Sequence, residues 1–521
     1  MTNTSVGAGL RRHYDFIVCG SGSSGSVVAA RLAQNPDVSV LLLEAGGSDE
    51  VPSVSNAAQW PENLGSERDW SFVSEPDPEL GGRSIPFSMG KVLGGGSSVN
   101  LMVWARGHRS DWDFFAAEAG DPAWGYESVL GIYRRIEDWH GTPDPAYRGV
   151  GGPVFVHPAP DPHPLARAVL DAAGAANIPT FASPNGRMMD EQRGAAITDV
   201  RWRDGKRLSV FGTYVKPHLS KPNLTVVPHA LVTRVMFTGT RATGVELMYR
   251  GSVEHVSANA EVVLSLGAIN TPKVLMQSGI GDEAELRRVG IPVRRHLPGV
   301  GRNLQDHYGF DCVWQFPDGI EGNTQPVATL FWDSPQAHDG PDMFACVGPF
   351  VKATPENVAR FGLPANGWTM VGAPTHPRSR GRLHLTGPAP SNPIRIEAGA
   401  LSDSDDLKDA IAIVETLREI GNSPELRRYV KREVMPGDLK GAELEAYLRN
   451  AVTTYWHETG TARMGRDDLA VVDSDLRVHG MQNLRIADGS IMPRITSANT
   501  MAPCVVIGER AADVIGIAHG L

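Results

Sequence analysis

A glycine-rich turn between two predicted strands constrains the fold of this chain more than any other feature. Residues 14–19 are a short β-rich run, the turn at 20–25 has the pattern G-x-G-x-x-G, and a second apolar run at 38–43 leads into Glu44. Between them, residues 27–32 supply a small apolar helix face, and Pro36 is expected to end that helix. In such a unit the glycines permit a tight turn, a close approach of main-chain N–H groups to a pyrophosphate, and close helix–strand packing. The sequence therefore predicts a dinucleotide-binding βαβ unit.

Separate positions of this unit have separate predicted tasks. The helix N-terminus would offer free N–H donors and a partial positive charge to the phosphates. Glu44 follows the last glycine by 44 − 25 = 19 residues, where a carboxylate can accept hydrogen bonds from both ribose hydroxyls. The cofactor-binding residues predicted in this segment are Gly20, Ser21, Gly22, Ser23, Ser24, Gly25 and Glu44.

Length and composition exclude several classes of protein. With 521 residues, 41% of them hydrophobic and 21% charged, the chain is typical of a globular protein with two or more domains. The net charge of −10 and the scattered basic residues argue against a nucleic-acid partner. Four cysteines without C-x-x-C or metal-ligand spacing predict free thiols, a reducing compartment and no metal site. No signal peptide and no apolar run of about 18 residues is visible, so we expect no membrane span and a cytoplasmic location.

Later segments predict a discontinuous first domain. Strands are expected at 224–227, 231–237, 242–249, 261–266 and 484–487, and a helix at 503–518. We expect an α/β fold with a Rossmann-like dinucleotide-binding domain and an α+β substrate-binding domain that contains an antiparallel sheet. The predicted boundaries are 1–157, 195–309 and 456–521 for the first domain, and 158–194 and 310–455 for the second.

The predicted second domain contains a strand pair and a helix. Residues 381–386 alternate as a half-buried strand, and residues 393–396 can pair with it. A helix is expected to follow, capped by Ser402 or Ser404 and stopped by Gly421.

Five further stretches, in order along the chain, carry a family resemblance. They are the glycine loop and its continuation at 90–107, then 267–281, 298–307, 456–462 and 487–493. Together with the N-terminal turn they resemble the glucose–methanol–choline (GMC) oxidoreductase family over essentially the whole chain. The most similar members are bacterial choline dehydrogenases and the oxidases of hydroxymethylfurfural and pyridoxine.

The resemblance implies FAD as the cofactor. Some relatives carry a covalently bound histidine where this chain has Val99, and valine has no nucleophile, so the FAD is expected to be non-covalent. By analogy Val232 holds the adenine, Asp488 and Gly489 lie at the pyrophosphate, and Asn499 lies near the flavin. The residues to which the resemblance assigns FAD contacts are Val92, Gly95, Asn100, Leu101, Met102, Val103, Val232, Trp456, Asp488, Gly489 and Asn499.

Alcohol oxidation needs a group that removes the hydroxyl proton, and the resemblance assigns this task to His457. The family usually has a second His or Asn 44 residues later, but 457 + 44 = 501 is Met501, whose thioether donates no hydrogen bond. Either another polar group enters from the substrate domain, or His457 acts alone, or the reaction is slow or different; we favour the first two. Tyr455 is expected to face the pocket, where its hydroxyl could partly replace the missing hydrogen-bond donor or could simply be packed in the core. Asn499 is the less favoured substitute for that donor.

Two other histidines in family-like stretches, His307 and His479, are interpreted as structural.

The sequence thus predicts FAD-dependent oxidation of a small-molecule alcohol, with molecular oxygen or a quinone as electron acceptor. An apolar pocket around Met501, Tyr455, Trp456 and Leu101 favours a primary aromatic or heteroaromatic alcohol over choline. Three alternatives remain: a flavin-containing lyase or light-driven enzyme on the same scaffold, an NAD-linked dehydrogenase, and a non-enzymatic flavin-binding or structural protein.

Overall fold

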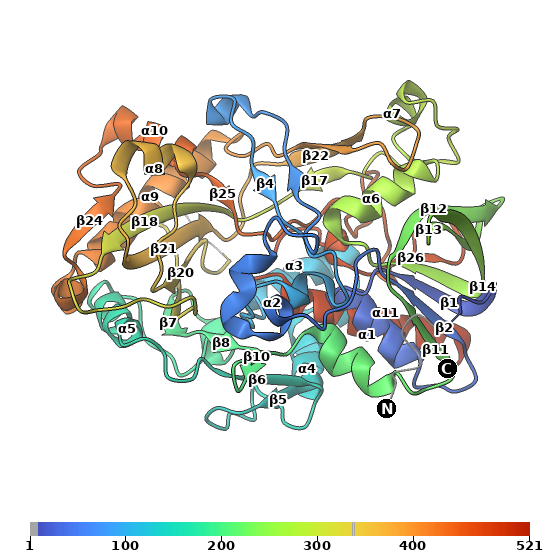
Figure 1. The fold of residues 1–521 in the computed structure, drawn as a ribbon, viewed down its shortest axis with the longest axis horizontal. Coiled ribbons are helices and arrows are strands. Elements are labelled where there is room, and N and C mark those ends of the chain that lie inside the picture. The colour runs from blue at the N-terminus through green and yellow to red at the C-terminus, as the bar shows by residue number, and fades with distance from the viewer. Residues whose placement is uncertain (1–8, 336, 338) are drawn as a thin grey trace.

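Two seven-stranded sheets with helices packed on them form the molecule (Figure 1). The computed structural model describes residues 9–335, 337 and 339–521. One continuous apolar core extends through both sheets. The expected combination of a Rossmann-like domain and an α+β domain with an antiparallel sheet is confirmed.

The first sheet has the order β11-β2-β1-β14-β13-β12, with β26 also paired to β14. Its parallel part consists of β11 (Leu224–Val227), β2 (Val40–Leu43), β1 (His13–Cys19), β14 (Ser252–Leu264) and β26 (Leu484–Ile486). An antiparallel extension is formed by β12 (Ala230–Thr238) and β13 (Arg241–Tyr249). Every strand predicted for this sheet is present, and the bounds agree within two residues except at the start of β14, which begins nine residues before the expected position 261.

The predicted turn lies at the carboxyl end of β1, a central strand of this sheet, and leads into a helix. Helix α1 (Ser23–Leu32) begins directly after Gly22 and ends four residues before Pro36. It lies against α11 (Met501–His519), and the Ser24 hydroxyl donates a hydrogen bond to the Cys504 carbonyl at 2.6 Å. Helix α6 (Gly267–Gln277) follows β14 in the same way that α1 follows β1. The first helix of the described chain and the C-terminal helix therefore meet beside the glycine turn.

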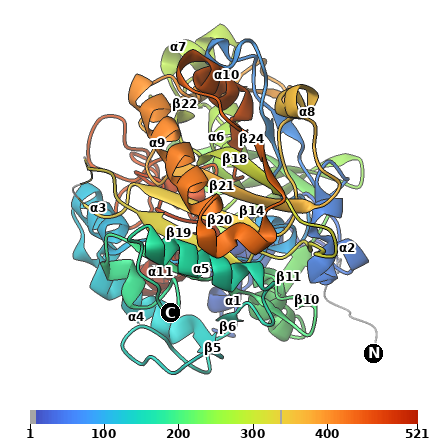
Figure 2. The ribbon, with the colours of Figure 1, turned by 90° about the vertical axis from the view of Figure 1, so that its left-hand side faces the viewer.

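The second sheet is antiparallel and has the order β24-β18-β21-β20-β19-β7, with β25 also paired to β18. Its strands are β24 (Arg432–Met435), β18 (Tyr308–Gln315), β21 (Gly367–Pro374), β20 (Met343–Gly348), β19 (Ala328–Trp332), β7 (Gly194–Ile197) and β25 (Thr453–Thr454). Figure 2 shows α9 (Ser404–Gly421) crossing in front of β21 and β20, with α5 (Leu165–Ala175) beside it.

Helix α9 ends at Gly421, as predicted, but its cap differs from the expected one. The Asp403 carboxylate accepts the N–H of Asp405, so the assignment of the cap to Ser402 or Ser404 is wrong. Asp at the N-cap makes the same hydrogen bond that a serine would make, and one residue of error is ordinary at a helix end.

The predicted strand pair forms, but outside both large sheets. β22 (Gly381–Leu385) pairs antiparallel with β23 (Ile394–Glu397), and β17 (Arg302–Leu304) completes a three-stranded sheet. β7 spans the boundary predicted at 195 and pairs with β19 in the second sheet. The domain boundaries themselves stay a prediction.

The remaining elements surround these layers. The helices are α2 (Pro52–Ser55), α3 (Arg109–Ala119), α4 (Tyr126–Ile136), α7 (Glu283–Arg288), α8 (Pro355–Phe361) and α10 (Gly441–Ala451). The short strands are β3 (Phe72–Val73), β4 (Pro86–Phe87), β5 (Glu137–Trp139), β6 (Val154–Pro158), β8 (Asp199–Val200), β9 (Trp202–Arg203), β10 (Lys206–Arg207), β15 (Ile280–Gly281) and β16 (Arg295–His296).

Three general features bear on the expectations from composition. All four cysteines are free thiols. Within the described ranges, no cluster of three or more His, Cys, Asp or Glu side chains could hold a metal ion. Among the helices of the same residues, none is both long enough and apolar enough to cross a bilayer.

Candidate active site

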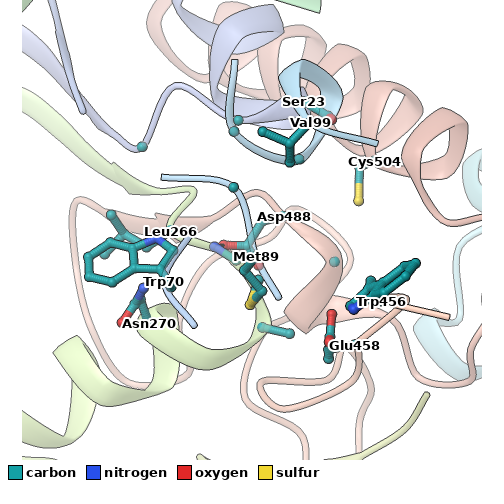
Figure 3. Close-up of a pocket in the computed structure, with 18 of the residues that line it drawn as sticks. Ser23, Trp70, Met89, Val99, Leu266, Asn270, Trp456, Glu458, Asp488 and Cys504 are labelled. Carbon is teal, nitrogen blue, oxygen red and sulfur yellow. Dashed lines mark hydrogen bonds between the residues drawn. The ribbon is translucent and has the colours of Figure 1, made fainter. Parts of the chain in front are cut away.

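A cavity of about 360 Å³ lies where the glycine turn, α6 and the C-terminal segment meet. Figure 3 shows Trp70 and Asn270 at one end of it, and Trp456 and Glu458 at the other. Most of the residues predicted to bind cofactor or substrate line it. They are Gly20, Gly22, Ser23, Ser24, Glu44, Gly95, Asn100, Leu101, Val103, Val232, Tyr455, Trp456, His457, Asp488, Gly489, Asn499 and Met501.

Four predicted residues, Ser21, Gly25, Val92 and Met102, are not among those that line the cavity. Ser21 instead orients Glu44, because its hydroxyl donates to Glu44 Oε2 at 2.8 Å and its N–H donates at 3.1 Å. Gly25 lies against the Gly20 carbonyl, where a Cβ would come within 2.0 Å of the oxygen. Val92 and Met102 are buried.

The glycine turn has the shape that a pyrophosphate requires. A Cβ on Gly22 would meet no atom within 4 Å, so a side chain there would project into open space beside the helix. The N-terminus of α1 has no side-chain cap, which leaves its N–H groups free for an anion. These residues therefore fit the phosphates of a dinucleotide.

Two carboxylates lie where the nucleotide tail would pass. Glu44 is 6% exposed, and burial raises its pKa although hydrogen bonds from Gly46 and Ser21 oppose this. Asp488 accepts from the Gly267 N–H at 2.9 Å and from the Thr271 hydroxyl at 2.6 Å, which ties the C-terminal segment to the start of α6. Burial raises the pKa of Asp488 as well.

At the other end of the cavity, His457 is the second member of a hydrogen-bonded chain. The Thr375 carbonyl accepts from His307 Nε2 at 2.9 Å, and His307 Nδ1 lies 2.9 Å from His457 Nδ1. A carbonyl only accepts, so His307 must carry its proton on Nε2 and accept at Nδ1. His457 therefore carries its proton on Nδ1, and its Nε2 is unprotonated.

Burial keeps the imidazoles of His307 and His457 uncharged. Burial and the neighbouring His307 hold the pKa of His457 well below its usual value. Burial lowers the pKa of His307 to about 3. Asp306 accepts the His457 main-chain N–H at 3.0 Å, and burial raises the pKa of this carboxyl to about 7. His457 is thus a neutral, unprotonated imidazole at neutral pH.

The donor beside this imidazole is Asn499. Its side-chain amide donates to His457 Nε2 at 3.0 Å, and both residues line the cavity. Met501 is 9% exposed, and its sulfur accepts a hydrogen bond from Arg201 at 3.5 Å. The Tyr455 hydroxyl donates to the Val371 carbonyl, so it has no hydrogen left to replace the missing donor. Asn499, the less favoured substitute at the sequence level, is the polar group that the geometry brings to His457.

Several residues at the site were missed from sequence. The sequence interprets His307 as structural, and the structure places its Nδ1 atom 2.9 Å from His457 Nδ1. The motif N-L-Q-D-H in which His307 stands was a usable signal. No pattern pointed to Trp60, Trp70 or Met89, which line the cavity from an irregular segment. The interpretation of His479 as structural stays a prediction, and its side chain hydrogen-bonds to the Gly465 carbonyl at 3.2 Å.

The comparisons with known proteins agree with this geometry. Sequence models described as "GMC oxidoreductase" match residues 14–309 and 377–508. The chain belongs to the GMC oxidoreductase family. The matched ranges include the glycine turn, the second glycine loop and His457.

Individual relatives of this GMC oxidoreductase are similar over nearly their full length. An alcohol dehydrogenase [acceptor] of Pseudomonas putida is 33% identical, with 96% of this chain and 95% of the relative covered. An oxygen-dependent choline dehydrogenase of Paraburkholderia xenovorans is 35% identical, with 96% and 94% covered. The crystal structure of pyridoxine 4-oxidase from Mesorbium loti matches with a TM-score of 0.90 and 31% identity, over 96% of this chain and 98% of that one.

Proposed function

We propose that this GMC oxidoreductase binds FAD non-covalently and oxidises a primary alcohol to the aldehyde, with His457 as the base. One observation carries the proposal. The neutral imidazole of His457 lines the cavity with its unprotonated Nε2 hydrogen-bonded to the Asn499 amide, and the same cavity is lined by a glycine turn that fits a pyrophosphate. Val99 stands at the position where some relatives attach flavin covalently, which supports a non-covalent cofactor.

The residues divide the work of the reaction between them. His457 Nε2 accepts the hydroxyl proton, and Asn499 turns its amide hydrogen to the oxygen on which negative charge develops. The bound flavin supplies the acceptor for the hydride that leaves the alcohol carbon. His307 keeps the second imidazole proton on Nδ1 throughout, so the reactive nitrogen always faces the cavity.

The surroundings of the base support an aromatic or heteroaromatic alcohol. The Tyr455 ring stacks on the His457 ring with centroids 5.5 Å apart, and Leu101, Val103 and Met501 add apolar surface to the same cavity. Glu458, next to the base, has a pKa raised well above its usual value by burial and by Asp306. Because burial opposes the charged form of this carboxyl, it is a weaker partner for a quaternary ammonium than a solvated carboxylate, so choline is less favoured.

The test is a spectrum followed by an alcohol panel. Purified protein reconstituted with FAD should absorb in the visible range and release the flavin on acid precipitation. Without oxygen, primary aromatic alcohols should bleach that absorbance and yield the aldehyde, and readmission of air or of a quinone then identifies the acceptor. A colourless protein that binds nicotinamide, or flavin-dependent turnover of a cyanohydrin without net oxidation, would contradict the proposal.

A further inference from the structure

Two buried arginines near the cavity, Arg201 and Arg207, lack an acidic partner among the residues that the structure describes. Among the described residues, the buried Arg106, Arg148 and Arg485 have carboxylates at 2.5, 2.9 and 2.6 Å. Arg201 and Arg207 are 1% and 7% exposed, and neither makes an ion pair within 4.0 Å. Burial of a charge without a partner is costly, so such groups are uncommon in folded proteins.

Arg201 lies directly behind the predicted substrate end. Its Nη1 donates to the sulfur of Met501 at 3.5 Å, its Nη2 reaches the Thr213 hydroxyl at 3.4 Å, and its Nε has no hydrogen-bond partner in the described structure. The face of Trp104 lies 5.6 Å from the guanidinium. A thioether, one long hydroxyl contact and an aromatic ring compensate a full charge only partly. Burial lowers the pKa of Arg201 to about 10, which leaves it protonated at neutral pH.

Arg207 supports the second glycine loop from the same side. Its Nη1 donates to the carbonyl of Asn100 at 2.5 Å and to the Asn100 side chain at 2.9 Å, and its Nε donates to the Val54 carbonyl at 2.9 Å. Its Nη2 has no partner in the described structure. Burial and the nearby charge of Arg201 lower the pKa of Arg207 to about 9. Two like charges are therefore held close together behind one wall.

That wall faces the cavity through Asn100 and Met501, which line it, whereas neither arginine does. A negatively charged substrate could therefore not contact either guanidinium directly. The two guanidinium charges can therefore act only at a distance, by electrostatic attraction of negative charge that develops inside the cavity.

We propose that Arg201 and Arg207, the arginine pair, stabilise the negative charge that the flavin ring gains when it accepts a hydride. The inference rests on the flavin binding proposed above. In that reaction the alcohol carbon gives up a hydride, the hydroxyl proton goes to His457, the aldehyde forms, and the acceptor ring gains two electrons and one unit of negative charge. The arginine pair would raise the two-electron potential of the bound flavin and assist hydride transfer as positioning charges, without touching the substrate.

The test uses FAD-loaded protein and needs no alcohol. We would measure the two-electron midpoint potential by dye equilibration, and the dissociation constant for sulfite, an anion that adds to the oxidised ring and leaves it negatively charged. Arg201→Met should weaken sulfite binding about tenfold and lower the potential by about 30 mV, the equivalent of tenfold for a two-electron couple. Arg201→Lys keeps the charge and should stay near the wild-type values. Arg207→Met should shift both readouts in the same direction.

Lys221 offers a matched control, because it is a partly buried cation outside the cavity lining, where its ammonium donates to the Ala33 carbonyl at 3.0 Å. Lys221→Met should leave the potential unchanged. Unchanged potential and sulfite affinity in FAD-loaded Arg201→Met and Arg207→Met would overturn the inference. If those variants do not bind FAD, the test uses the wild type. A two-electron midpoint potential of its bound FAD below that of free FAD in the same buffer would overturn the inference. Failure of the wild type to bind FAD would remove the proposed function instead.

Discussion

Replacement of His307 by leucine gives the sharpest test of the histidine chain. In the wild type, His307 Nδ1 accepts a hydrogen bond from the Nδ1–H group of His457, and the two nitrogens are 2.9 Å apart. Leucine fills the space but accepts no hydrogen bond, so the His457 N–H loses its partner in a buried site, or the imidazole adopts the other tautomer and blocks its own reactive nitrogen. Both changes act on the base without touching the flavin cradle.

The size of the effect follows from the cost of an unsatisfied buried donor, about 1–3 kcal/mol. Since about 1.4 kcal/mol corresponds to tenfold in rate, flavin reduction should slow by roughly fivefold to 150-fold. The assay is anaerobic stopped-flow reduction of FAD-loaded protein by the best alcohol of the panel. His307→Asn keeps an acceptor and should recover part of the rate.

A matched control separates this role from general structural damage. His479 also lies in a family-like motif and contacts a backbone carbonyl, that of Gly465, at 3.2 Å. His479→Leu should therefore leave the reduction rate within about twofold. An FAD-loaded His307→Leu protein that is reduced at the wild-type rate would refute the tautomer argument.

Further predictions concern the cradle, the donor and the base. Gly22→Val should abolish FAD binding, measured by visible absorbance after reconstitution, while circular dichroism stays unchanged, because the new side chain enters space that no protein atom occupies. Asn499→Ala should slow flavin reduction by about tenfold to a hundredfold, and Met501→Asn in that background should restore part of it, as single-turnover rates would reveal. The reduction rate should stay constant as pH falls from neutral to below 6.5, since the lowered pKa keeps His457 unprotonated there; a fall centred near 6.5 would contradict it.

The parts of the fold that depend on local pattern could be predicted. The turn at 20–25, its flanking strands and Glu44 follow from glycine spacing and apolar runs, because each property is a requirement on neighbouring residues. The strand pair β22–β23 and helix α9 were predictable for the same reason.

Contacts between distant segments could not be read from the sequence. His307 and His457 are 150 residues apart, and Arg201 and Met501 are 300 apart. No periodicity reports such pairs, since they depend on how the second sheet is docked against the first. The direction of the Tyr455 hydroxyl is equally invisible at the sequence level, because it depends on which carbonyl of β21 lies within reach.

A single-turnover comparison of wild type and His457→Ala tests the central claim most directly. Both proteins should bind FAD with the same visible spectrum, because His457 makes no hydrogen bond to the glycine turn or to Glu44 in the described structure. Mixed anaerobically with a primary aromatic alcohol, the wild type should bleach and release aldehyde, and His457→Ala should stay oxidised over the same period. Equal rates of bleaching in the two FAD-loaded proteins would contradict the account.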